Sequence, residues 1–313
     1  MRRLLSILSL IVLISSCTHK GFCVFHPHKA IVTVKFDWNN APEADPKGMC
    51  VMFYPIDGGD HLRYDFTGTN GGQIEITAGR YKVLCYNNDT EAVQFNGQND
   101  FENHTAYTRE GNIFESIFGN GHSVPKKGTE EERVVICPDM MWGNCIEEVE
   151  IIEYTESVIT LYPDELTSIY TYEIRNVKNL KHASQMCATL SGMSGSLCFS
   201  TRSLGSESVT LPFEASFDNE STIYGRFLTF GHNEDNADPH RMNLYVWMDD
   251  GQKLLYGSDS EHFNVTSQIH DAPDKRRVHI IIDGLDLPMP IENGHGFKPS
   301  VDDWEVIEGD IIM

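Results

Sequence analysis

Cys17 is the residue whose surroundings point most directly to a chemical role. It follows Arg2, Arg3, an apolar run over 4–14 and two small serines. A basic start, a short apolar core and a small-residue cleavage site are typical of a secretory signal peptide. The apolar run is shorter than the roughly 20 residues that a membrane-spanning helix needs. Removal of residues 1–16 would therefore leave Cys17 at the new amino terminus.

The four residues Ile14–Cys17 also resemble a bacterial lipobox, at which a peptidase cuts just before a cysteine that carries diacylglycerol. By this resemblance, Cys17 would be acylated on its sulfur and on its new amino group. Each buried methylene adds about 0.8 kcal/mol of membrane affinity, so two or three acyl chains would hold the protein on a lipid bilayer. The alternative is an ordinary cleaved signal in which Cys17 has no such role. We expect a signal peptide over 1–16, a lipidated tether over 17–29 and an outer-membrane location, on its periplasmic or cell-surface face.

Without Cys17, seven of the eight cysteines remain, so at least one thiol would stay unpaired. Cys137 and Cys145 bracket a turn-rich loop, and Cys187 and Cys198 flank a Ser/Gly hairpin. Exported proteins meet an oxidising compartment, and both combinations are therefore candidate disulfides. No CxxC spacing occurs in the sequence, so zinc-ribbon and thioredoxin-like sites have no support.

Motifs that would carry catalysis are absent from the sequence. It contains no HExxH, Walker loop or dinucleotide-binding fingerprint. The turn over 192–195 has part of a nucleophile-elbow pattern, but Ser196 occupies the position of the second glycine. The oxygen-rich loop over 231–238 lacks the spacing of an EF-hand, which leaves adventitious calcium as the alternative to a solvated loop. We predict a protein that is not an enzyme and that has no cofactor and no metal site.

The net charge of the chain limits its class of partner. It has 24 Lys and Arg residues against 46 Asp and Glu residues, a formal net charge of −22. Nucleic-acid binding requires clustered basic residues, so we expect no nucleic-acid partner. The same imbalance argues against electrostatic attachment to an anionic bilayer, and the acyl chains would have to supply the anchoring.

The elements that must position these residues are predicted to be strands. Residues 31–38 alternate apolar and polar side chains with a period of two, which marks a half-buried strand. Residues 244–248 and 253–256 are two further strands, and the turn over 249–252 predicts a hairpin between them.

Many short strands separated by Gly, Pro, Asn and Asp, without a long helix, are typical of antiparallel β-sandwiches. We therefore predict an all-β chain with two domains. A boundary near 145–148 would divide it into an N-terminal β-sandwich over 30–147 and a C-terminal β-sandwich over 148–313.

Several stretches of the chain share recognisable but loose patterns without a catalytic signature. They are Ile74–Asn87, Ile159–Leu166, Leu190–Gly195, Phe230–His232, Val278–Leu285, Gly296–Pro299 and Val301–Trp304. In these stretches the chain resembles an uncharacterised group of Bacteroides-type lipoproteins, which is similar to the fimbrillin-like proteins of type V pili. The resemblance implies two tandem transthyretin-like antiparallel β-sandwiches and a role in the cell envelope.

The resemblance also implies that subunits associate by strand exchange, in which a strand of one subunit fills a groove of another. The chain ends on an apolar stretch, and its candidate donor-strand residues are Trp304, Val306, Ile311, Ile312 and Met313. The alternative is an ordinary closing strand of the second sandwich. No basic site for strand removal is evident between the tether and the first domain, which favours an anchor or accessory subunit over a polymerising pilin.

The leading hypothesis is a lipid-anchored envelope protein that acts in fimbria-like assembly or adhesion, with fimbrillin-like subunits as partners. The rival hypothesis is a surface carbohydrate-binding lipoprotein, in which Trp142 or Trp247 stacks on sugar rings. Core packing is the alternative role for both tryptophans.

Overall fold

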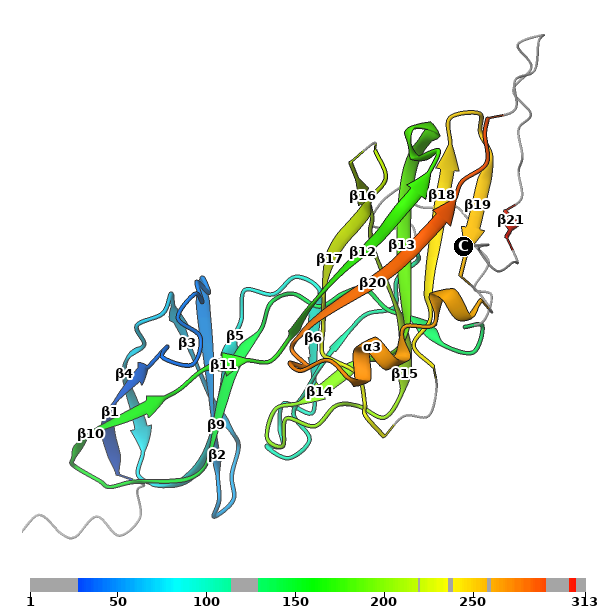
Figure 1. Cartoon of the computed structure of the whole chain (residues 1–313). Helices are drawn as coiled ribbons and strands as arrows, with labels where there is room; N and C mark the ends of the chain where they lie inside the picture. Colours follow the sequence, from blue (N-terminus) through cyan, green and yellow to red (C-terminus); the bar gives the residue numbers. More distant parts are fainter. Residues whose placement is uncertain are drawn as a thin grey trace, which may run out of the picture.

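The computed structural model describes residues 28–113, 129–218, 220–235, 239–257, 260–290 and 304–307. These residues form mainly strands, with two short 3-10 turns, η1 (Leu180–His182) and η2 (Glu261–Phe263), and one helix, α3 (Thr266–His270). The prediction of a mostly β chain with several sheets is confirmed. No helix within the described ranges is long and apolar enough to cross a membrane. Figure 1 shows an elongated molecule with a lobe at each end.

The N-terminal lobe is built from two sheets whose apolar faces meet. The strand orders are β10-β1-β4 and β11-β9-β5-β2-β3. The bounds are β1 (Lys29–Phe36), β2 (Gly48–Pro55), β3 (Leu62–Thr67), β4 (Gly72–Thr77), β5 (Gly79–Asn87), β9 (Trp142–Ile151), β10 (Glu156–Leu161) and β11 (Asp164–Glu165). Alternation along β1 buries Val32 and Val34 completely, and they pack against Val51 and Val83 of the facing sheet. The strand predicted from the period-two pattern is thus confirmed.

The C-terminal lobe also packs two sheets around one core. Their strand orders are β16-β17-β12-β20 and β21-β19-β18-β13-β15-β8. The bounds are β8 (Arg133–Val134), β12 (Ser168–Lys178), β13 (Ala183–Ser194), β15 (Ser208–Glu214), β16 (Ser216–Phe217), β17 (Ile223–Thr229), β18 (Met242–Met248), β19 (Lys253–Tyr256), β20 (Arg277–Asp286) and β21 (Glu305–Val306). β18 and β19 form the predicted hairpin, in which Trp247 pairs with Lys253.

A fifth sheet lies between the lobes (Figure 1). Its strands are β14 (Ser196–Cys198), β7 (Thr105–Thr108) and β6 (Val93–Asn96). Its side chains pack against the outer face of β2 and β5, where Met52 and Leu84 are completely buried. The five-stranded sheet is therefore covered on both faces at its centre, which explains why β2 has almost no exposed residue.

Three of the five sheets are mixed, which corrects the prediction of purely antiparallel pairing. Parallel neighbours are β1 with β10, β12 with β20, β15 with β8 and β19 with β21. Parallel partners require a long connection, and each of these pairs is separated by a long stretch of chain. An alternating burial pattern specifies which face of a strand is buried but not the direction of its neighbour.

Strands from both halves of the sequence contribute to each lobe. The predicted boundary at 147/148 falls inside β9. β10, which follows the boundary, pairs with β1, whereas β8, which precedes it, pairs with β15. The chain therefore passes between the lobes more than once before it reaches β12.

Two tyrosine–histidine pairs are buried in the structure. The Tyr54 hydroxyl lies 2.8 Å from His104 Nδ1, and the Tyr170 hydroxyl lies 2.9 Å from His232 Nδ1. The Nε2 atoms of both histidines are buried and have no hydrogen-bond partner among the described residues. Burial disfavours the charged imidazolium and lowers the pKa of each histidine to about 4.

Candidate functional site

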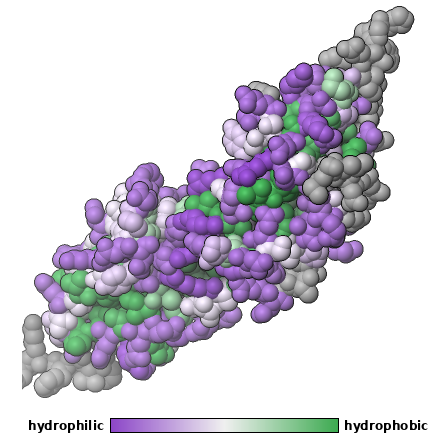
Figure 2. Space-filling view, in the orientation of Figure 1, coloured by the Kyte–Doolittle hydropathy of each residue, from purple (hydrophilic) through white to green (hydrophobic). Residues whose placement is uncertain are grey.

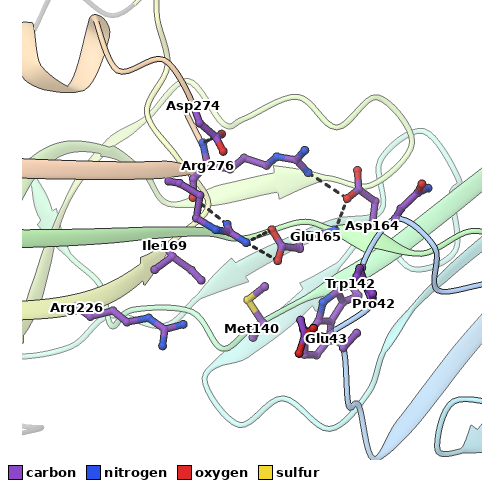
Figure 3. A pocket seen from close by; sticks show the side chains of 14 residues that line it. Pro42, Glu43, Met140, Trp142, Asp164, Glu165, Ile169, Arg226, Asp274 and Arg276 are labelled. Atoms are coloured by element: carbon purple, nitrogen blue, oxygen red, sulfur yellow. Dashed lines mark hydrogen bonds and ion pairs between the residues drawn. The ribbon is translucent and has the colours of Figure 1, made fainter.

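A cleft of about 530 Å³ opens where the two lobes meet (Figure 3). Its walls come from the loop that precedes β2, the start of β9, β11 and the facing parts of β12, β17 and β20. The lining residues are Asn40, Ala41, Pro42, Glu43, Ala44, Met140, Trp142, Asp164, Glu165, Ile169, Arg226, Asp274, Arg276 and Arg277. This volume lies within the range of small-molecule binding sites.

The short strand β11 carries two carboxylates into the cleft. It pairs with the start of β9, so that Asp164 lies opposite Gly143 and Glu165 lies opposite Trp142. Asp164 binds the guanidinium groups of Arg202 and Arg276, each at 3.1 Å. Burial alone would raise the pKa of Asp164, but the Glu165 backbone N–H and the two arginines hold it below its usual value.

The second carboxylate of β11 completes a polar seam between the lobes. Both oxygens of Glu165 lie 2.5 Å from one terminal nitrogen of Arg277. Arg276 ends the turn that leads into β20, and Arg277 is the first residue of that strand. The Arg276 backbone N–H donates to the Asp274 side chain at 2.8 Å. These ion pairs connect β11 of the N-terminal lobe with β20 of the C-terminal lobe.

Trp142 forms part of an apolar surface in the same cleft. Its backbone N–H donates to the Asn87 side chain at 2.8 Å, and its ring contacts the ring of Trp38 perpendicularly at 6.5 Å. Figure 3 shows Met140 beside Trp142, with Arg226 across the cleft from them. Trp142 is one of the two tryptophans singled out from the sequence, and the structure places it in a cleft.

Trp247 has a different environment. Its ring packs perpendicularly on Trp304, with ring centroids 4.6 Å apart, and Trp304 also contacts Tyr245 at 5.4 Å. These rings cover the outer face of the six-stranded sheet. Trp247 therefore takes the packing role that was the alternative for both tryptophans.

The predicted donor strand lies partly within the described residues. β21 extends the six-stranded sheet at its edge, where Glu305 pairs with Leu254 and Val306 with Leu255. The segment 304–307 thus closes a sheet of its own chain. The other candidate donor residues, Ile311, Ile312 and Met313, lie outside the described residues, as does Cys17.

Neither predicted disulfide is formed in the structure, where all four cysteines are free thiols. Cys137 packs against the core of the C-terminal lobe, whereas Cys145 packs against the layer between the lobes. Cys187 is buried on β13, whereas Cys198 Sγ lies 3.3 Å from the Glu102 carbonyl. Closeness in sequence did not predict which cysteines lie together, because the chain directs the two members of each pair into different layers of the fold.

The structure brings Cys145 and Cys198 to the same residue instead. Cys145 Sγ lies 3.5 Å from the Ser200 carbonyl oxygen, and Cys198 Sγ lies 3.3 Å from the Ser200 hydroxyl. We expect oxidised glutathione to join these two thiols by disulfide exchange, with release of two reduced glutathione molecules. Mass spectrometry of non-reduced peptides would detect the link, which Cys187→Ser should leave intact. A Cys137–Cys145 or Cys187–Cys198 peptide would contradict this prediction.

The N-terminal lobe also presents an edge strand with an apolar outer face. β10 pairs with β1 on one side, and within the described part of the chain no strand pairs with its other side. Val158 on β10 is 58% exposed, Ile31 on β1 is 44% exposed and Tyr154 in the preceding turn is 75% exposed. Figure 2 shows apolar side chains at the surface of this lobe.

The chain has recognisable relatives. The family model described as "Domain of unknown function (DUF5119)" matches residues 16–214. A protein of Bacteroides ovatus described as "Putative fimbrium anchoring subunit Fim4B" is 26% identical over 242 residues, which cover 76% of this chain and 68% of that protein.

Two solved structures are among those to which this chain is similar. The crystal structure of "a putative adhesin from Bacteroides ovatus" has a TM-score of 0.62 at 20% identity, and the match covers 88% of this chain and 99% of that chain. The fimbrial anchor protein Mfa2 from Porphyromonas gingivalis has a TM-score of 0.48 at 14% identity, with 81% of this chain and 90% of that chain covered.

Proposed function

This chain belongs to the DUF5119 family, and we propose that it is a lipid-anchored envelope protein that serves as an anchor or accessory subunit of a fimbria-like assembly. The resemblance to fimbrial proteins that was predicted from the sequence is confirmed by the family match and the fimbrial relative. The name of that relative supports the anchoring role. We propose a structural rather than an enzymatic role for this chain.

The edge of β10 is the observation that carries the proposal. An unpaired strand edge presents a row of N–H and C=O groups to which another strand can add. Exposed apolar side chains beside it, Ile31 and Val158, would give the added segment a surface to cover. We infer that the partner is an extended segment of a fimbrillin-like subunit, which lies along β10.

The tether would place this edge close to the membrane. β1 begins at Lys29, the last residue of the proposed lipidated tether over 17–29. An acylated Cys17 in the outer membrane would therefore hold the N-terminal lobe near the lipid surface. We propose that the two lobes are transthyretin-like sandwiches in tandem and that residues 1–16 are a signal peptide.

A cell that lacks this protein is expected to release its fimbria-like polymer into the medium, because nothing would tether the base of the polymer to the membrane. The measurement is the share of the polymer subunit in the medium and on washed cells, determined by immunoblotting. The native protein should restore cell-bound polymer. An unchanged distribution after deletion would contradict the anchoring role.

The same assay tests the edge of β10. Val158→Lys introduces a charge on the apolar outer face beside the edge and should prevent retention of the polymer, since lysine protects strand edges against added strands. Tyr224→Lys is the matched control, because Tyr224 is 46% exposed on β17 of the other lobe. If both variants retain the polymer equally well, the contact with the polymer lies away from β10, for example at the predicted C-terminal donor strand.

A further inference from the structure

We propose that the cleft between the lobes binds a neutral saccharide, a property separate from the anchoring role. A sugar ring has an apolar C–H face and a rim of hydroxyl groups. A site for it needs an aromatic or apolar surface next to a few fixed donors and acceptors. The cleft combines both features.

The apolar surface of the cleft is held in place from behind. Trp142 is anchored through its backbone to Asn87, and Trp38 packs against its ring. Trp38 is fixed in turn, because its Nε1 donates to the Thr69 carbonyl at 3.0 Å. A ring that is already positioned loses little conformational entropy when a ligand covers it.

The polar groups of the cleft fall into two sets. Asp164 and Glu165 are already paired with arginines, which fixes their orientation and leaves further lone pairs for hydroxyl donors. Arg226 has no ion-pair partner among the residues that the structure describes and is exposed in the cleft. It can therefore donate to ligand oxygens without breaking an existing ion pair.

The charges of the cleft favour a neutral ligand over an ionic one. The lining holds four acidic residues, Glu43, Asp164, Glu165 and Asp274, and three arginines, so it is nearly neutral. The whole chain carries a net charge of −22 and would repel an acidic polysaccharide at long range. Hydroxyl groups, which both donate and accept hydrogen bonds, suit such a mixture of carboxylates and guanidinium groups.

Binding to an array of immobilised neutral and sialylated oligosaccharides tests the proposal, with affinities of the hits measured by titration calorimetry on the folded full-length protein. The native protein should bind neutral members. Trp142→Ala should weaken binding by about tenfold through loss of the stacking surface. Arg226→Ala, which leaves the packing untouched, should weaken it by about threefold.

Trp247→Ala is the matched control, because it removes a partly exposed tryptophan outside the cleft, and it should bind as the native protein does. Failure of the native protein to bind any neutral oligosaccharide at millimolar concentration would overturn the proposal. So would binding confined to sialylated sugars, or affinities that neither Trp142→Ala nor Arg226→Ala changes.

Discussion

Replacing Cys17 by serine is expected to move the protein from the membrane fraction into the soluble fraction. Serine lacks the thiol that would carry the diacylglycerol, and the strongly acidic chain has no electrostatic attraction to anionic lipids. At about 0.8 kcal/mol per buried methylene, loss of two or three acyl chains removes essentially all of the membrane affinity. Fractionation followed by mass spectrometry of the mature amino terminus measures the effect.

The Cys17→Ser variant must still be exported and cleaved, since an uncleaved signal peptide would itself hold the variant on the membrane. Residues 1–16 are therefore exchanged for a signal peptide with an ordinary cleavage site in the Cys17→Ser variant. Cys198→Ser in the native precursor is the matched control, because it removes a thiol but not the lipid, and it should stay with the membrane. Retention of a correctly cleaved Cys17→Ser protein on washed membranes would contradict lipid anchoring through this residue.

Acid is expected to destabilise the folded protein strongly between about pH 6.5 and pH 4. The pKa of His104 and of His232 falls to about 4 in the folded state, first because of burial and then because of neighbouring basic side chains. His61 and Arg63 lie near His104, whereas His240, His270 and Lys275 lie near His232.

The direction in which stability changes with pH follows from proton binding. Below the unfolded pKa of about 6.5, the two histidines bind protons in the unfolded chain but stay neutral in the folded chain. The free energy of unfolding therefore falls as the pH falls. The stability that the two neutral histidines allow is fully present above that pKa and is lost as the pH approaches 4. Each histidine is expected to cost roughly 1–3 kcal/mol over this range, which is large against a total of about 5–15 kcal/mol.

Urea denaturation at about pH 7.5 and pH 4.5 measures the free energy of unfolding on both sides of this transition. The double variant His104→Asn and His232→Asn should show a much smaller difference between the two pH values, because asparagine does not titrate. His279→Asn is the control, since His279 is exposed on β20 and its loss should leave the difference unchanged. An undiminished difference in the double variant would assign the acid sensitivity to other groups.

The local features of the fold could be predicted from the sequence with fair success. The alternation over 31–38 predicted β1, and the turn over 249–252 predicted the hairpin of β18 and β19. Both signals are short-range, since the burial of alternate side chains and the conformation of a two- to four-residue turn depend on neighbouring residues. Trp142 and Trp247 were candidates for sugar stacking by residue type alone, and only the fold separated them.

Long-range pairing could not be predicted from the same patterns. Nothing local to β10 specifies that it lies parallel to β1, more than one hundred residues earlier in the chain. Likewise, the loop length between Cys137 and Cys145 gave a false guide to pairing, because the chain leaves one layer for another between them. Loop-closure entropy grows slowly with loop length, so a distant partner costs little more than a near one.

The sequence by itself determined the strand-rich architecture, the acidic surface and the candidate lipid site, because these depend on composition and on spacing over a few residues. Only the tertiary structure decided the parallel neighbours, the shared contact of Cys145 and Cys198 with Ser200, and the cleft. The cleft in particular joins residues from the loop before β2, from β11 and from the turn before β20. Its arginines and carboxylates meet because strands of both halves of the chain pack together at the junction of the lobes.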